Sequence, residues 1–170
     1  MAIKQTGRHA EAPALAQDAG QEVLVAVRVR EHPHCLLCGA GDPLGLKLAF
    51  AVQADGSVLA EFGCPSCLAG YPGMVHGGVV AALLDAAMTN ALFARGLVGV
   101  TAELTLRFLT PLRLDRPAQV RASLDAAPAH SLYCLEAELA QDGQRVARAT
   151  AKFLRQAPPR RGEPAGGSSP

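Results

Sequence analysis

The stretch that decides the fold runs from residue 76 to residue 95 and reads H-G-G-V-V-A-A-L-L-D-A-A-M-T-N-A-L-F-A-R. Residues 77–95 are rich in Ala and Leu and free of proline, which predicts a helix. Apolar residues lie nearly all round this helix, so we expect it to be buried rather than on the surface.

Strand patterns precede the helix. Residues 46–53 and 57–63 are short apolar runs joined by Ala54-Asp55-Gly56, and Asp-Gly supplies the positive φ of a tight hairpin turn. Further upstream, Val residues alternate at every second position of residues 22–30, which favours another strand there.

Four more runs typical of strands follow the helix, at residues 98–109, 118–126, 131–141 and 144–155. A second tight turn is predicted at Asp142-Gly143. The order predicts an α+β domain in which a meandering antiparallel sheet wraps around one long central helix. This layout is that of the hotdog fold. An all-β barrel is the competing architecture, but it leaves the buried helix unexplained.

Length and composition bound the class of protein. The 170 residues suit one domain, predicted over 21–156, with disordered ends at 1–20 and 157–170. Aromatic residues make up 4% and the net charge is +1, which argues against a nucleic-acid partner. No run approaches the roughly 20 apolar residues that span a membrane, and residues 1–20 resemble no export signal. We therefore expect a cytoplasmic protein without a membrane partner.

The predicted helix carries a single charge, Asp85, between His76 and Arg95. A carboxylate on an apolar helix is costly unless it is paired or faces a cavity, so Asp85 is either bonded to nearby backbone or functional. Gly77 and Gly78 favour the functional interpretation. They start the helix without Cβ atoms, and the free N–H groups of a first turn can stabilise a developing oxyanion.

The spacing along the helix adds a constraint. Gly78 and Asp85 are seven residues apart, which places them near one face but about 10 Å apart along the axis. One carbonyl group cannot contact both. A two-fold dimer with antiparallel helices would pair Gly77 of one subunit with Asp85 of the other, so the prediction includes a homodimer. A dimer of dimers remains open.

His76-Gly77-Gly78 followed by Asp85 resembles the signature of hotdog-fold acyl-CoA thioesterases of the phenylacetate-degradation type. Asp42-Pro43-Leu44-Gly45-Leu46 is similar to the Asn-Pro-x-Gly-Leu of that family, and Phe108-Leu109-Thr110-Pro111 resembles the end of its third strand. The resemblance covers residues 35–155. It implies hydrolysis of an acyl-CoA thioester to a free acid and CoA.

The resemblance also implies roles for individual residues. The Gly77 amide resembles the oxyanion donor, and Gly78 beside it leaves room for the substrate. Asp85 resembles the catalytic carboxylate, either as nucleophile or as general base for water. Thr101 resembles a hydroxyl that orients the attacking water, and His76 a residue that braces the loop. No cofactor for catalysis is implied.

One position departs from the family pattern. Many relatives carry Asn or Gln about six residues before the His, where this chain has Gly70. A non-catalytic acyl-CoA-binding protein on the same fold is therefore the main alternative to an enzyme. An enoyl-CoA hydratase is less favoured because no second acid is suitably spaced near His76. A zinc-ribbon nucleic-acid binder is the weakest alternative.

Four of the five cysteines form two pairs, Cys35 with Cys38 and Cys64 with Cys67. Two Cys-x-x-Cys pairs suit a closed tetrahedral Zn²⁺ site. Antiparallel pairing of residues 46–53 with 57–63 would bring the pairs to the same end, so the sequence predicts structural zinc on four thiolates. His34 is a substitute or supporting ligand. The alternatives are metal-free thiols or a disulfide within either pair.

Overall fold

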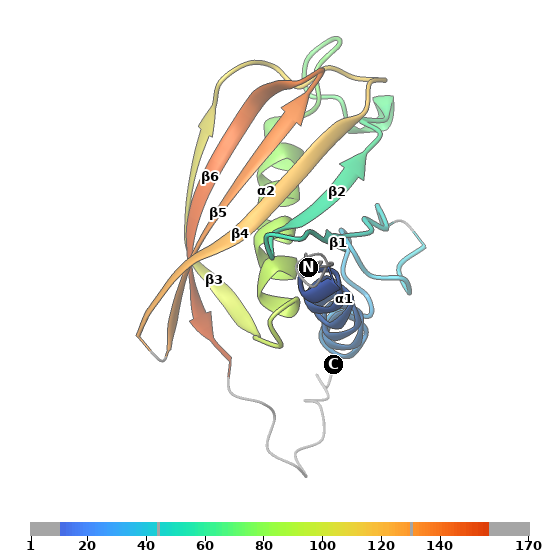
Figure 1. The fold of residues 1–170 in the computed structure, drawn as a ribbon. Helices are drawn as coiled ribbons and strands as arrows, with labels where there is room; N and C mark the ends of the chain where they lie inside the picture. Colours follow the sequence, from blue (N-terminus) through green and yellow to red (C-terminus); the bar gives the residue numbers. More distant parts are fainter. Residues whose placement is uncertain (1–10, 44, 130, 157–170) are drawn as a thin grey trace, which may run out of the picture.

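The computed structural model describes residues 11–43, 45–129 and 131–156. Its elements are α1 (Glu11–Glu31), β1 (Ala51–Val52), β2 (Val58–Phe62), the 3₁₀ helix η1 (Ser66–Leu68), α2 (Gly77–Phe93), β3 (Gly99–Phe108), β4 (Ala118–Ala129), β5 (Leu132–Gln141) and β6 (Gln144–Arg155). The six strands form one antiparallel sheet that curves around α2 (Figure 1). The predicted α+β hotdog fold is confirmed.

The strand order differs from a plain meander. It runs β1-β2-β4-β5-β6-β3, so β4, β5 and β6 follow one another but β3 lies at the far edge beside β6. The prediction that the last four strands are neighbours in sequence order is therefore wrong for β3. Alternation along a strand indicates which side chains face the core, but it does not indicate which strand lies alongside.

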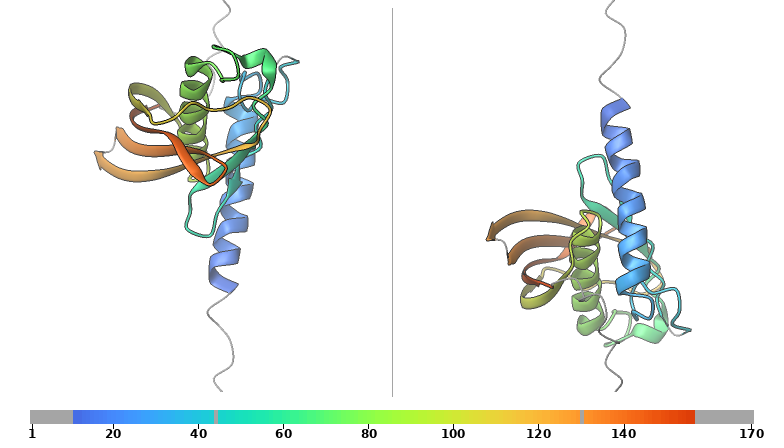
Figure 2. Two further views of the ribbon diagram at one scale, coloured as in Figure 1. Left: turned by 90° about the horizontal axis from the view of Figure 1, so that it is seen from above. Right: turned by 90° about the horizontal axis from the view of Figure 1, so that it is seen from below.

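Helix α2 is buried over most of its length, as predicted. Its largest side chains with no more than 1% exposure are Leu83, Leu84, Met88, Leu92 and Phe93. In both views of Figure 2, α2 lies between the C-terminal strands and α1. The helix is apolar all round because the sheet covers one side and α1 covers the other.

Helix α1 replaces the strand predicted over residues 22–30, and that prediction is wrong. Leu24 and Val27 are buried, at 0% and 5% exposure, whereas Val25 and Val29 are 38% and 63% exposed. A spacing of three residues between buried positions fits a helix. The helix begins at Glu11, within the segment 1–20 that was expected to be irregular. Residues 1–10 and 157–170 lie outside the described residues.

Two glutamines of α1 occupy the outer edge of β1. Gln17 Nε2 donates to Val52 O at 2.7 Å, and Gln21 Nε2 donates to Phe50 O at 3.1 Å. Gln21 Oε1 accepts from Val52 N at 2.7 Å. This end of the sheet is therefore covered by a helix, and the predicted strand over residues 46–53 pairs with β2 only at Ala51–Val52.

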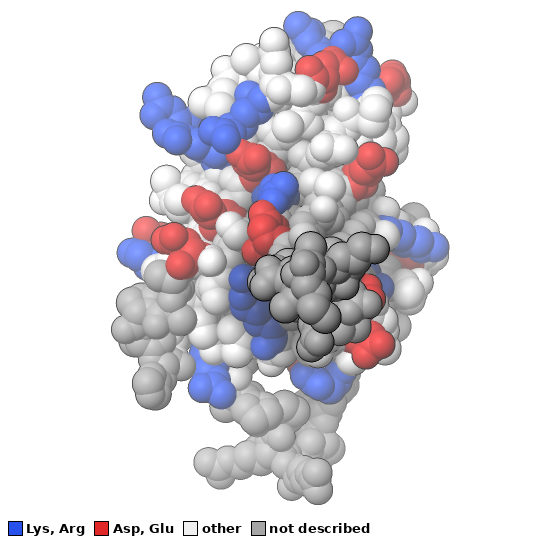
Figure 3. All heavy atoms as spheres, viewed as in Figure 1, with Lys and Arg blue, Asp and Glu red and all other residues white. Residues whose placement is uncertain are grey.

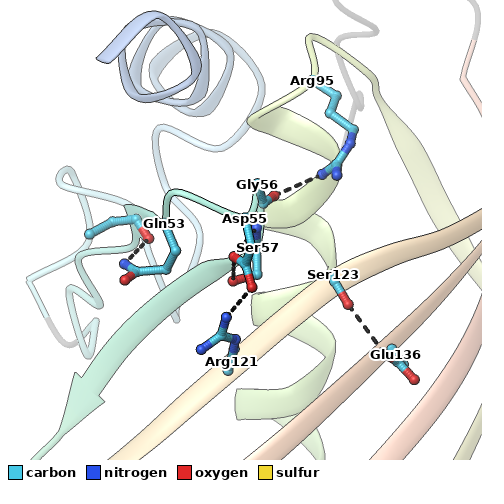
Figure 4. Close-up of polar contacts among 9 residues, drawn as sticks. Gln53, Asp55, Gly56, Ser57, Arg95, Arg121, Ser123 and Glu136 are labelled. Atoms are coloured by element: carbon cyan, nitrogen blue, oxygen red, sulfur yellow. Dashed lines mark hydrogen bonds and ion pairs between the residues drawn. The ribbon is translucent and has the colours of Figure 1, made fainter. Parts of the chain in front are cut away.

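Both predicted hairpin turns form, with positive φ at Gly56 (78°), Asp142 (51°) and Gly143 (74°). At the first turn, Asp55 accepts hydrogen bonds from the amide and hydroxyl of Ser57 and forms an ion pair with Arg121 (Figure 4). The bonds from Ser57 lower the pKa of Asp55. Arg95, just past α2, donates to Gly56 O at 3.1 Å and ties this turn to the helix.

Acidic and basic side chains both occur on the face seen in Figure 3, and basic side chains gather at its upper left. None of the described helices is long and apolar enough to cross a membrane.

Candidate functional site

The first turn of α2 leaves one amide free. His76 Nδ1 accepts from Gly78 N at 2.9 Å, and His76 O accepts from Val79 N at 2.9 Å and Val80 N at 3.2 Å. Within the described residues, Gly77 N has no hydrogen-bond partner. Of the two glycines singled out in the sequence, Gly77 therefore offers a donor, whereas the Gly78 amide is engaged by the His76 ring.

His76 thus acts as the N-cap of α2, which accounts for its place in the motif. We expect His76→Ala to lower the free energy of unfolding by about 1 kcal/mol because the Gly78 amide loses its acceptor. His76→Asn, which restores a good capping residue, should recover most of this loss. Urea denaturation of the two variants and the wild type measures the difference; equal stability for His76→Ala and the wild type would contradict the capping role.

The absence of Asn or Gln six residues before His76 has a steric reason. A Cβ atom on Gly70 would lie 2.9 Å from His76 Cα and 3.2 Å from the His76 ring. The two segments approach this closely because Gly70 N donates to Met74 O, and His76 N donates to Leu68 O. In this loop conformation no larger residue fits at position 70, so the family's amide side chain has no counterpart there.

An apolar cavity of about 260 Å³ lies beside Gly77. Its lining includes Val80 of α2, Phe108 of β3 and Val146 of β6. The Phe108 ring is close to the helix start, since a Cβ on Gly77 would lie 3.4 Å from Phe108 Cζ. The free amide of Gly77 is therefore at the edge of a space that suits an apolar group.

Asp85 is bonded to Thr101. Thr101 Oγ1 on β3 donates to Asp85 Oδ1 at 2.6 Å, and the Asp85 carboxylate is half-buried. In the described part of the chain the second carboxylate oxygen has no hydrogen-bond partner. The Asp85 side chain is therefore not tied to local backbone, and one oxygen is left to accept a proton or attack a carbonyl.

The Gly77 amide and the Asp85–Thr101 pair lie at different points of the same helix and strand. Eight residues of helix separate Gly77 from Asp85, about 12 Å along the axis. Phe108 lies against Gly77 and Thr101 is bonded to Asp85, so the two parts of the candidate site stand at opposite ends of β3.

The structure does not bring the four predicted zinc ligands together. Cys35 and Cys38 lie with His32, whereas Cys64 and Cys67 belong to no cluster of three metal-ligand side chains within the described residues. Cys64 is buried, and its thiol donates to Phe62 O at 3.7 Å. Burial raises the pKa of Cys64 to about 11.

The cysteine pairs stay apart because the hairpin opens. Residues 46–50 leave the side of β2, and a hollow lined by Leu46, Leu48, Phe62 and Pro65 lies between the two segments. Pairing therefore does not extend far enough to carry Cys35 and Cys38 to Cys64. His32 was not singled out from the sequence, although a His three residues before Cys-x-x-Cys is a pattern that would have signalled it.

Comparison with known proteins matches residues 72–148 to the family model of the thioesterase superfamily. No curated protein sequence matches the chain. The solved structures with a similar fold include a thioesterase superfamily protein, with a TM-score of 0.68 and 24% identity over 88% of this chain and 82% of the other.

Two further solved structures have a similar fold. The Escherichia coli PaaI protein from the phenylacetic acid degradation operon has a TM-score of 0.69 and 17% identity, over 84% of this chain and 96% of its own. A hypothetical thioesterase from Streptococcus pneumoniae, solved with coenzyme A, has a TM-score of 0.59 and 20% identity, over 64% of this chain and 87% of its own. Residues 72–148 of this chain are thus similar to the thioesterase superfamily, and the chain shares the hotdog fold of these solved structures.

Proposed function

We propose that this protein hydrolyses an acyl-CoA thioester to a free carboxylic acid and CoA. The observation that carries the proposal is the arrangement of polar groups on an otherwise apolar helix. A free Gly77 amide lies beside an apolar cavity, and a half-buried Asp85 carboxylate is held by Thr101. An oxyanion donor and a carboxylate of this kind can together catalyse the hydrolysis of a thioester.

In the proposed reaction the Gly77 N–H donates a hydrogen bond to the thioester carbonyl oxygen and stabilises negative charge as it forms on that oxygen. Asp85 acts on the carbonyl carbon by one of two routes. Either it accepts a proton from an attacking water, or its free oxygen attacks and forms an anhydride that water then opens. In both routes the carbon–sulfur bond breaks, and CoA leaves as a thiolate that takes up a proton. In both routes Thr101 fixes the carboxylate through Oδ1 and leaves Oδ2 to react.

The proposed site is shared by two subunits. The free edge of β3 supports this, because β3 is a ten-residue edge strand bonded to β6 on one side and to nothing described on the other. Val100, Phe108 and Leu109 are 49%, 56% and 45% exposed. The opposite edge of the sheet is covered by α1, so β3 is the edge left for a partner.

The register of such a pairing is suggested by the site itself. If two β3 strands pair antiparallel about a two-fold axis near the middle of the strand, the Phe108 end of one subunit lies beside the Thr101 end of the other. The Phe108 ring lies near Gly77 and Thr101 binds Asp85, so this pairing would bring the oxyanion donor of one subunit toward the carboxylate of its partner. The homodimer would hold two equivalent sites, and a dimer of dimers is left open.

Thr101 is expected to position Asp85 rather than to react. Thr101→Val keeps the shape of the side chain but removes the hydroxyl, and we expect kcat to fall by about 10-fold, roughly the loss of a hydrogen bond to a charged group. Thr101→Ser keeps the hydroxyl and should retain most of the activity. Steady-state thioester hydrolysis measures both variants. Equal losses in the two would mean that the methyl group, not the hydroxyl, matters.

A panel of acyl-CoAs with aromatic and straight-chain acyl groups tests the function itself. Release of free CoA is followed with a thiol reagent, and binding is measured in parallel by calorimetry. The apolar cavity beside Gly77 favours an apolar acyl group. Saturable release of CoA supports the enzyme. Binding without release on every member would support the alternative, a non-catalytic acyl-CoA-binding protein. The cytoplasmic location stays a prediction.

A further inference from the structure

We infer that His32, Cys35 and Cys38 bind one zinc ion at the end of α1. One ligand atom from each residue lies within 4.8 Å of the other two, and Cys38 Sγ is 3.8 Å from His32 Nδ1. In a tetrahedral zinc site, bonds of about 2.3 Å to sulfur and about 2.1 Å to nitrogen place neighbouring ligand atoms about 3.6 Å apart. The three atoms are thus close to the separation that zinc requires.

The backbone holds these side chains together without the ion. Cys35 N donates to His32 O at 3.3 Å, and Gly39 N donates to Cys35 O at 2.8 Å. The turn is so tight that a Cβ on Gly39 would lie 2.4 Å from Cys35 N. Residue 39 must therefore be glycine in this conformation, and the turn directs Cys38 back toward His32.

The surroundings fix the ligand side chains from the side of α2. The His32 ring packs edge-on against Phe93, with ring centroids 5.0 Å apart and an interplanar angle of 89°. Cys38 is 4% exposed, and the side chain of Asn90 is within hydrogen-bonding reach of its sulfur. Asn90 Oδ1 is buried without a partner in the described part of the chain. Polar groups that support metal ligands in this way are typical of zinc sites.

The fourth coordination position is open to solvent. A hollow lined by Glu31, Pro33 and His34 adjoins His32 and Cys35, so a water molecule can complete the tetrahedron. Both thiols bind as thiolates and release their protons to solvent. The bound ion would join the C-terminal end of α1 to the turn that follows it and would stabilise the packing of α1 on α2.

The test uses the full chain without a histidine tag, purified under reducing conditions. Metal is removed with a chelator, and zinc or cobalt is returned. We expect about one metal per chain, a rise in the melting temperature on return of zinc, and a sulfur-to-cobalt charge-transfer band with Co²⁺. Metal removal and return are measured on the wild-type chain. The test therefore still gives a result if one of the variants fails to fold.

Cys35→Ser and Cys38→Ser are expected to lose the metal, and Cys64→Ser is the matched control from the other pair. Circular dichroism establishes that each variant is folded. The proposal fails if the reduced wild type takes up no zinc, or if folded Cys35→Ser and Cys38→Ser both retain it. Loss of zinc from Cys64→Ser would instead contradict this proposal and favour a zinc site built on all four cysteines. None of these readouts depends on thioester hydrolysis.

Discussion

Asp85→Asn is expected to lower kcat for acyl-CoA hydrolysis by about 10²–10⁴-fold. The substitution keeps the size and planarity of the side chain, and its carbonyl oxygen can still accept the hydrogen bond from Thr101. It removes the negative charge, so the residue can neither take a proton from water nor attack the thioester carbonyl. The effect should fall on kcat rather than on folding.

The matched control is Asp125→Asn, which removes the charge of an exposed aspartate on β4. This variant should hydrolyse the same acyl-CoA at the wild-type rate. Circular dichroism and the melting temperature establish that both variants are folded. Turnover of Asp85→Asn within a few-fold of the wild type would remove Asp85 from the mechanism and leave the alternative of a structural carboxylate.

The sequence predicted the central helix and the strands after it because their apolar patterns are long and regular. Residues 77–95 were expected as a helix and α2 spans Gly77–Phe93. Helix α1 was missed for a local reason. The alternating valines of residues 22–30 fit a strand. In the structure this segment is helical because Leu24 and Val27 then pack on the same side. Gln17 and Gln21 of the same helix form hydrogen bonds with the edge of β1.

The candidate site, like the fold, could be predicted from the sequence only in part. Asp85 stood out because it is the only charge on an apolar helix, and Thr101 came from family resemblance alone; their 2.6 Å contact depends on β3 passing beside α2. The zinc ligands could not be predicted in full, because spacing within a Cys-x-x-Cys pair says nothing about which other segment approaches it. The opening of the hairpin before Ala51, at residues 46–50, determines which segment approaches.

Gly77→Pro is expected to lower kcat by about 10²–10³-fold, the usual effect of removing one oxyanion-hole donor. Proline lacks the N–H, and it is well tolerated at the first position of a helix. His76, the residue before it, has φ −59° and ψ 135°, a conformation that suits a residue preceding proline. Gly77→Ala keeps the N–H, and its Cβ would meet Phe108 at an ordinary contact distance of 3.4 Å. It should therefore stay active, as the control.

Mixing Gly77→Pro with Asp85→Asn then distinguishes a shared site from a site within one chain. In a mixed dimer with shared sites, one site pairs the intact Gly77 of one chain with the intact Asp85 of the other, and the second site carries both defects. After equal mixing and free exchange of subunits, half of the dimers are mixed and each has one working site. Activity should then recover to about a quarter of the wild-type value per chain. If each site were built from a single chain, every site would carry one defect and mixing two inactive proteins would restore nothing. Exchange itself is checked with differently tagged subunits, so a failure to recover activity in exchanged dimers would count against the shared site.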